Sequence, residues 1–128
     1  MLRQIPFLVA LAAFVTSPAQ AQGHTMHHHP RGAKIIMIGT VVDPMCAFVQ
    51  QAADSVQARC ADQQRDTTLS PMLIADGELY VLKFGETTAA TVSAARPLLG
   101  KRVKVDGTVY PAGNSYLIVV DSIRARGH

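Results

Sequence analysis

A two-residue turn motif, Asp76-Gly77, constrains the fold of this chain more than any other feature of the sequence. It separates two short β-rich runs, residues 69–75 and 78–84. Asp-Gly favours a type I′ turn, because both positions tolerate positive φ angles and this turn matches the right-handed twist of paired strands. The sequence therefore predicts a β-hairpin over residues 69–84.

A second hairpin is predicted near the C-terminus. Valines alternate with polar residues over residues 102–110, which is typical of a strand with one buried and one wet face. The segment PAGNS, residues 111–115, is rich in turn-forming residues and precedes a second β-rich run, residues 116–124. We expect these two arms to pair.

Two further elements complete the predicted domain. Residues 33–42, AKIIMIGTVV, are rich in Ile and Val and too short for a typical independent helix, so they predict a strand with a bend or bulge at Gly39. Residues 87–99 are Ala-rich with apolar residues at helical spacing. They predict a helix that ends near Pro97 and Gly100.

The predicted elements follow the order strand, helical insertion, strand, strand, helix, strand, strand. This is the order of an OB-fold, a five-stranded Greek-key barrel with a helix between its third and fourth strands. We therefore expect a single all-β domain with one or two short helices over residues 33–126. An α+β sandwich is the alternative.

The first 21 residues have the features of an export signal. Arg3 gives a positive start, residues 5–15 are almost wholly apolar, and Ala19-Gln20-Ala21 has the small-x-small form of a cleavage site. The apolar run is shorter than the roughly 20 residues that cross a bilayer, and no second apolar stretch follows. The expectation is an exported protein without a membrane span, periplasmic where an outer membrane exists and otherwise secreted.

Residues 22–32, QGHTMHHHPRG, are expected to form a disordered His-rich leader. Cleavage after Ala21 would make His24 the third residue, where a free amine, two amide nitrogens and an imidazole suit Cu(II) or Ni(II). Cyclisation of Gln22 would remove that amine and leave only a weaker set of imidazole and thioether ligands. The other interpretations of this segment are a plain polar leader and a cloning remnant. The candidate ligands for copper, nickel or zinc are His24, Met26, His27, His28 and His29.

The predicted insertion, residues 43–68, holds the only cysteines, Cys46 and Cys60. Two cysteines in a small exported domain predict a disulfide. A continuous helix over residues 44–60 would separate them by about 21 Å along its axis and exclude that bond. We therefore favour a short helix over residues 55–64, with metal-linked thiols and free or redox-active thiols as alternatives.

The motifs GTVVDPMC, RCAD, DGELYVL and GKRVKVDGTVY resemble a group of small exported bacterial OB-fold proteins of largely uncharacterised function, over about residues 35–123. In those relatives a histidine often lies three residues before the second cysteine, and another cysteine four residues after it. A His and three Cys would form a metal or haem site by ligand type. Here the two positions hold Gln57 and Gln64, so the resemblance implies that only the disulfide is kept.

Enzyme chemistry finds little support in the sequence. No histidine lies inside the predicted barrel, so a Ser-His-Asp or Cys-His set would have to take its base from the leader. The carboxylates are scattered, and no phosphate-binding glycine loop is present. Cleavage would remove only Arg3 and lower the net charge from +3 to +2, which argues against nucleic acid as a partner. We therefore expect that the protein is not an enzyme.

The preferred hypothesis is a non-catalytic binding or assembly module for a small ligand or an envelope protein, peptide or glycan. It would use the barrel face, and the candidate residues of this surface are Tyr80, Arg102, Lys104 and Tyr110. The alternative is metal handling through the leader.

Overall fold

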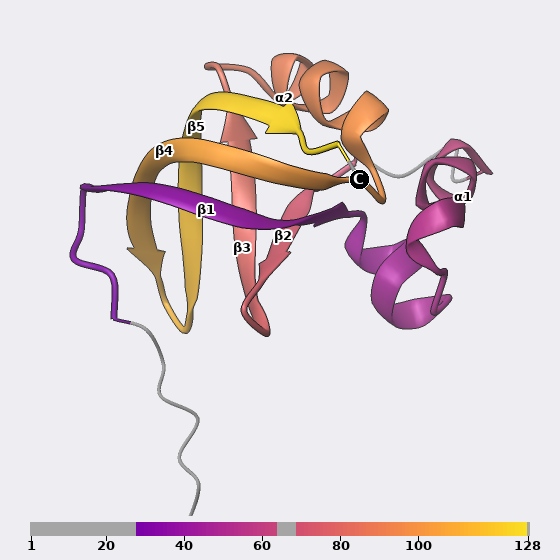
Figure 1. Ribbon diagram of the computed structural model, residues 1–128, viewed down its shortest axis with the longest axis horizontal. Helices are drawn as coiled ribbons and strands as arrows, with labels where there is room; N and C mark the ends of the chain where they lie inside the picture. Colours follow the sequence, from indigo (N-terminus) through magenta and orange to yellow (C-terminus); the bar gives the residue numbers. More distant parts are fainter. Residues whose placement is uncertain (1–27, 64–68, 128) are drawn as a thin grey trace, which may run out of the picture.

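The computed structural model describes residues 28–63 and 69–127, and these form a closed five-stranded β-barrel with two short α-helices (Figure 1). Around the barrel the strands run in the order β1-β2-β3-β5-β4. This arrangement confirms the OB-fold-like prediction and excludes the α+β sandwich. The strands are β1 (Ala33–Val42), β2 (Met72–Ala75), β3 (Glu78–Phe84), β4 (Arg102–Ala112) and β5 (Ser115–Ala125).

Strand β1 pairs with two neighbouring strands, as the glycine within it predicts. It pairs with β4 along most of its length and with β2 over residues 40–42. Thr40 lies at the changeover, opposite both Arg102 and Ile74. A side chain at Gly39 would collide with the backbone of β2, so the glycine permits the close approach that closes the barrel.

Both predicted hairpins are present. Asp76 and Gly77 have φ angles of 51° and 76°, the positive values that a type I′ turn requires. The β4–β5 hairpin is longer than predicted, because Ala112 still pairs with Ser115 and only two residues remain in the turn.

Strand β2 is shorter than predicted and begins at Met72 instead of residue 69. Pro71 lies just before it and has no backbone N–H to donate to a sheet. Its carbonyl oxygen still accepts a hydrogen bond from the backbone N–H of Leu82, at 3.1 Å.

The barrel interior is built from alternate residues of each strand. These side chains are almost completely buried, and burying one of this size contributes about 1.5–3 kcal/mol. The largest of them are Val41, Leu73, Tyr80, Leu82, Val103, Val105, Val109 and Ile118.

Helix α2 (Thr88–Ala95) covers one end of the barrel (Figure 1). The Thr87 side chain caps its N-terminus by accepting a hydrogen bond from the Ala90 backbone, at 3.0 Å. The α-helix ends earlier than predicted and passes into a 3₁₀ turn, Arg96–Leu98, because Pro97 cannot continue the helical hydrogen bonding.

The insertion between β1 and β2 contains the predicted disulfide. Cys46 and Cys60 are bonded, with Cα atoms 5.9 Å apart. A π-helical turn, Met45–Val49, carries the first cysteine, and helix α1 (Gln57–Gln63) carries the second. A 3₁₀ turn, Asp54–Val56, leads directly into α1, in agreement with the short helix predicted over residues 55–64 and not with a continuous helix from residue 44. The thiols are neither free nor metal-linked.

The Gln57 side chain is buried within the insertion, only 1% exposed, and links two parts of its backbone by hydrogen bonds. Its Oε1 accepts a hydrogen bond from the backbone N–H of Asp43, and its Nε2 donates to the Ala52 carbonyl oxygen. Asp43 in turn accepts a hydrogen bond from the Cys46 backbone, at 3.0 Å. Gln64 lies outside the described residues.

No helix within residues 28–63 and 69–127 is long and apolar enough to cross a membrane.

Candidate functional site

A cavity of about 520 Å³ lies between the β2–β3 and β4–β5 hairpins. Both turns are at the barrel end opposite α2 (Figure 1). This volume is in the range of small-molecule sites, roughly 300–1,000 Å³. None of the described insertion residues lines the cavity, and its walls include His28, His29, Glu78, Pro111, Asn114 and Tyr116.

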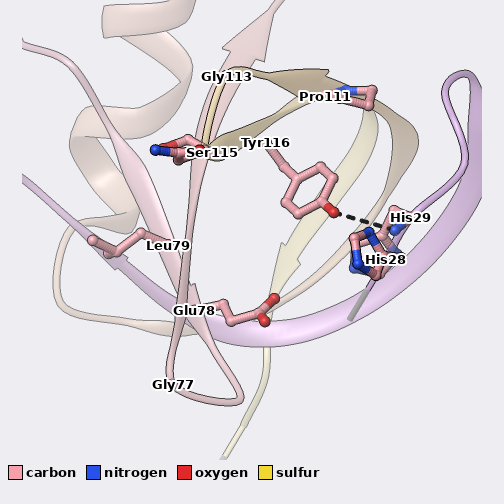
Figure 2. A pocket seen from close by; sticks show the side chains of 10 residues that line it. His28, His29, Gly77, Glu78, Leu79, Pro111, Gly113, Ser115 and Tyr116 are labelled. Atoms are coloured by element: carbon pink, nitrogen blue, oxygen red, sulfur yellow. Dashed lines mark hydrogen bonds between the residues drawn. The ribbon is translucent and has the colours of Figure 1, made fainter. Parts of the chain in front are cut away.

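His29 is wedged against two tyrosines that come from different strands. Its ring meets Tyr116 edge-on, with centroids 5.2 Å apart, and Tyr80 at 5.8 Å. The two tyrosine rings stack on each other at 6.0 Å. Figure 2 shows Tyr116 and His29 turned toward each other, and a hydrogen bond of 3.4 Å links the His29 backbone N–H to the Tyr116 hydroxyl oxygen.

A hydrogen-bond chain runs from His29 through Tyr80 to Glu78. The Tyr80 hydroxyl donates to Glu78 Oε2 at 2.8 Å, and His29 Nε2 lies 3.1 Å from the Tyr80 hydroxyl oxygen. A phenol has one proton to give, and here it goes to the carboxylate. His29 must therefore carry its proton on Nε2 and donate to Tyr80.

Burial and the neighbouring Glu78 carboxylate raise the pKa of Tyr80 well above its ordinary value. Burial disfavours the charged phenolate, and the Glu78 hydrogen bond and charge favour the neutral phenol. The Tyr80 hydroxyl therefore keeps the proton that it donates to Glu78 at neutral pH.

The segment before β1 is attached to the barrel. The backbone N–H of Gly32 donates to the Val109 carbonyl oxygen at 2.8 Å, and the Arg31 guanidinium lies over the Tyr110 ring, 5.7 Å from its centroid. The expected leader, residues 22–32, thus ends in a section that packs on the barrel. Sequence reasoning missed this contact, although Pro30-Arg31-Gly32 has the composition of a turn that could fold back.

A second hollow, of about 500 Å³, is also lined by His29. It contains two of the predicted surface residues, Tyr80 and Arg102. Tyr80 is only 2% exposed and belongs to the barrel interior. It therefore presents little of its surface to the hollow beyond its hydroxyl group. The other two predicted residues, Lys104 and Tyr110, line neither hollow.

The predicted metal ligands divide into two groups. His24, Met26 and His27 lie outside the described residues, whereas His28 and His29 line the cavity. Within residues 28–63 and 69–127, no three His, Cys, Asp or Glu side chains are grouped so that they could hold a metal ion.

No protein-family model, curated protein or solved structure matches the chain. Evidence about function therefore comes from the geometry of the site itself.

Proposed function

We propose that this protein is a non-catalytic, exported binding module that holds a small ligand, or a group presented by an envelope partner, at the end of its barrel. The cavity between the two hairpins carries this proposal. It combines apolar and aromatic walls with a few convergent polar groups, which is the usual composition of a ligand site.

The hydrogen bonds among the polar side chains of the site favour a binding function over a catalytic one. His29, Tyr80 and Glu78 donate and accept along one chain, so each fixes the orientation of the next. Two members of this chain, His29 and Glu78, line the cavity and can present oriented polar groups to a ligand. A nucleophile activated by a neighbouring base would require a different arrangement, in which the base accepts a proton from a reactive side chain.

Export is supported by two independent features. The first 21 residues have the charge, apolar run and cleavage motif of a secretory signal. The Cys46–Cys60 disulfide is a bond that persists in oxidising compartments. Both features are consistent with a periplasmic or secreted protein.

A fragment screen followed by ¹H–¹⁵N NMR tests the proposed binding function. We expect amide shifts from bound fragments to cluster at Gly77, Glu78, Asn114 and Tyr116, which surround the cavity. Shifts confined to the insertion or to the outer face of β4 would contradict the proposal.

A matched pair of variants adds the same bulky side chain at two places. Asn114→Trp places it in the cavity wall, whereas Lys104→Trp places it at an exposed position of β4 outside the cavity. Fragment binding should be lost in the first variant and kept in the second. Equal binding by both variants would mean that the cavity is not the site.

A further inference from the structure

We propose that Tyr80, Tyr116 and Glu78 form a slot for an N–H-bearing five-membered heteroaromatic ring, which His29 fills from the same chain. An imidazole-type ring of a ligand would take this slot when His29 leaves it. The inference rests on the proposed function, because the slot borders the same cavity.

The shape of the slot suits a small flat ring. The His29 ring is inclined to Tyr116 by 84° and to Tyr80 by 61°, so it presents an edge contact to each. Its centroid distances of 5.2 and 5.8 Å lie in the range that favours edge-to-face aromatic pairs. Two aromatic walls from different strands thus define the slot.

The polar end of the slot selects for an N–H group. Tyr80 gives its own proton to Glu78, so its oxygen faces His29 Nε2 as an acceptor. A ring without an N–H would leave this partly buried oxygen without the donor it has now, and the loss of that hydrogen bond would weaken binding. Imidazole meets the requirement, whereas thiazole, with a similar ring but no N–H, does not.

His29 can leave without detaching the rest of its segment. Gly32 and Arg31 hold the chain on the barrel through Val109 and Tyr110, on the C-terminal side of Pro30. His29 lies on the other side of that proline, and it is only partly buried.

His29 also belongs to the lining of two hollows. His29 lines both the cavity of about 520 Å³ and the hollow of about 500 Å³ that contains Arg102. A ligand ring in the place of His29 would border both, so substituents on that ring could extend into either hollow. The His29 side chain therefore acts as a displaceable occupant of the binding site.

Imidazole itself is the probe for this inference. We expect the His29→Ala variant to bind imidazole with saturable NMR shifts at Glu78, Tyr80 and Tyr116, at least tenfold more tightly than the unaltered protein. Thiazole should bind the same variant at least tenfold more weakly than imidazole does. Equal imidazole affinity for both proteins, or equal affinity of the variant for the two rings, would overturn the slot.

Two further variants keep the test decisive. His29→Phe keeps an aromatic ring in the slot and should bind no imidazole. His29→Ala combined with Tyr80→Phe removes the acceptor oxygen and should abolish the preference for imidazole over thiazole. If imidazole fails to bind His29→Ala while fragments still bind the unaltered cavity, the slot is wrong and the proposed function stands. If fragments fail as well, the proposed function is wrong.

Discussion

Gly39 of β1 lies so close to Ile74 of β2 that a Cβ atom at position 39 would overlap the Ile74 carbonyl oxygen. The Leu73 side chain crowds the same point. This is where β1 leaves β4 and begins to pair with β2. Closure of the barrel therefore depends on the absence of a side chain at one position of its first strand.

Replacing Gly39 with alanine should lower the free energy of unfolding by about 1–3 kcal/mol, the usual cost of overpacking a well-packed interior. The obstructing atom belongs to the backbone, so rotation of a side chain cannot relieve the overlap. Urea denaturation measures the change. Gly127→Ala is the control, because no atom lies within 4 Å of the added carbon, and it should change stability by less than about 0.5 kcal/mol.

Replacing both cysteines with alanine should cost about 3 kcal/mol in the chain-entropy model, since the bond joins residues 14 apart in the sequence. Reduction of the unaltered protein should produce a similar loss, and the Cys46→Ala/Cys60→Ala variant should not respond to the reductant. Two reactive thiols in exported protein, denatured without reductant, would contradict the disulfide.

Tyr80→Phe should lower stability by about 1 kcal/mol at neutral pH, because it removes the hydroxyl that bonds both Glu78 and His29. The same variant should lose the His29 ring contact in part, which NMR of the histidine protons can detect. Tyr110→Phe is the matched control, since this tyrosine lies outside the hydrogen-bond chain. Equal losses in the two variants would contradict a specific role for the Tyr80 hydroxyl.

The raised pKa of Tyr80 predicts a loss of stability at high pH. The folded protein keeps the phenol proton after the unfolded chain, with an ordinary tyrosine pKa of about 10, has released it. The contribution of Tyr80 is therefore complete below pH 10 or so and falls as the pH rises toward the folded pKa. The free energy of unfolding, measured between about pH 8 and 11.5, should therefore fall less in Tyr80→Phe than in the unaltered protein, because the variant lacks this phenol.

The metal-handling alternative makes a separate prediction. If the mature chain begins with a free Gln22, Cu(II) or Ni(II) should bind with His24 as the third residue, and removal of residues 22–30 should abolish this binding. Calorimetric titration of both forms gives the answer. Intact mass of the exported protein checks the terminus, and a cyclised or displaced first residue would remove the amine-based site.

Local patterns were sufficient to predict the barrel. Asp76-Gly77 specifies a turn through its own backbone preferences, and the alternation in β4 reports which face is buried. The presence of two cysteines in a small domain expected to be exported predicted the disulfide. Each of these inferences uses residues that are near one another in the sequence or a general chemical rule.

The centre of the site could not be predicted in this way. His29 and Tyr80 are 51 residues apart, and no periodic pattern links a histidine before the first strand to an interior tyrosine of the third. Gln57 is similar, because its local sequence predicts a helix but not a buried side chain that joins two backbone groups. Such contacts depend on the assembled fold.

Both cysteines lie in the connection between β1 and β2, so the covalent loop that their bond closes contains no strand of the barrel. Every strand can therefore reach its partners before any oxidation takes place. Barrel assembly and disulfide formation are therefore separable steps. Without the disulfide, the same chain should still assemble its barrel, and the loss of order should be concentrated in the described part of the insertion, residues 43–63.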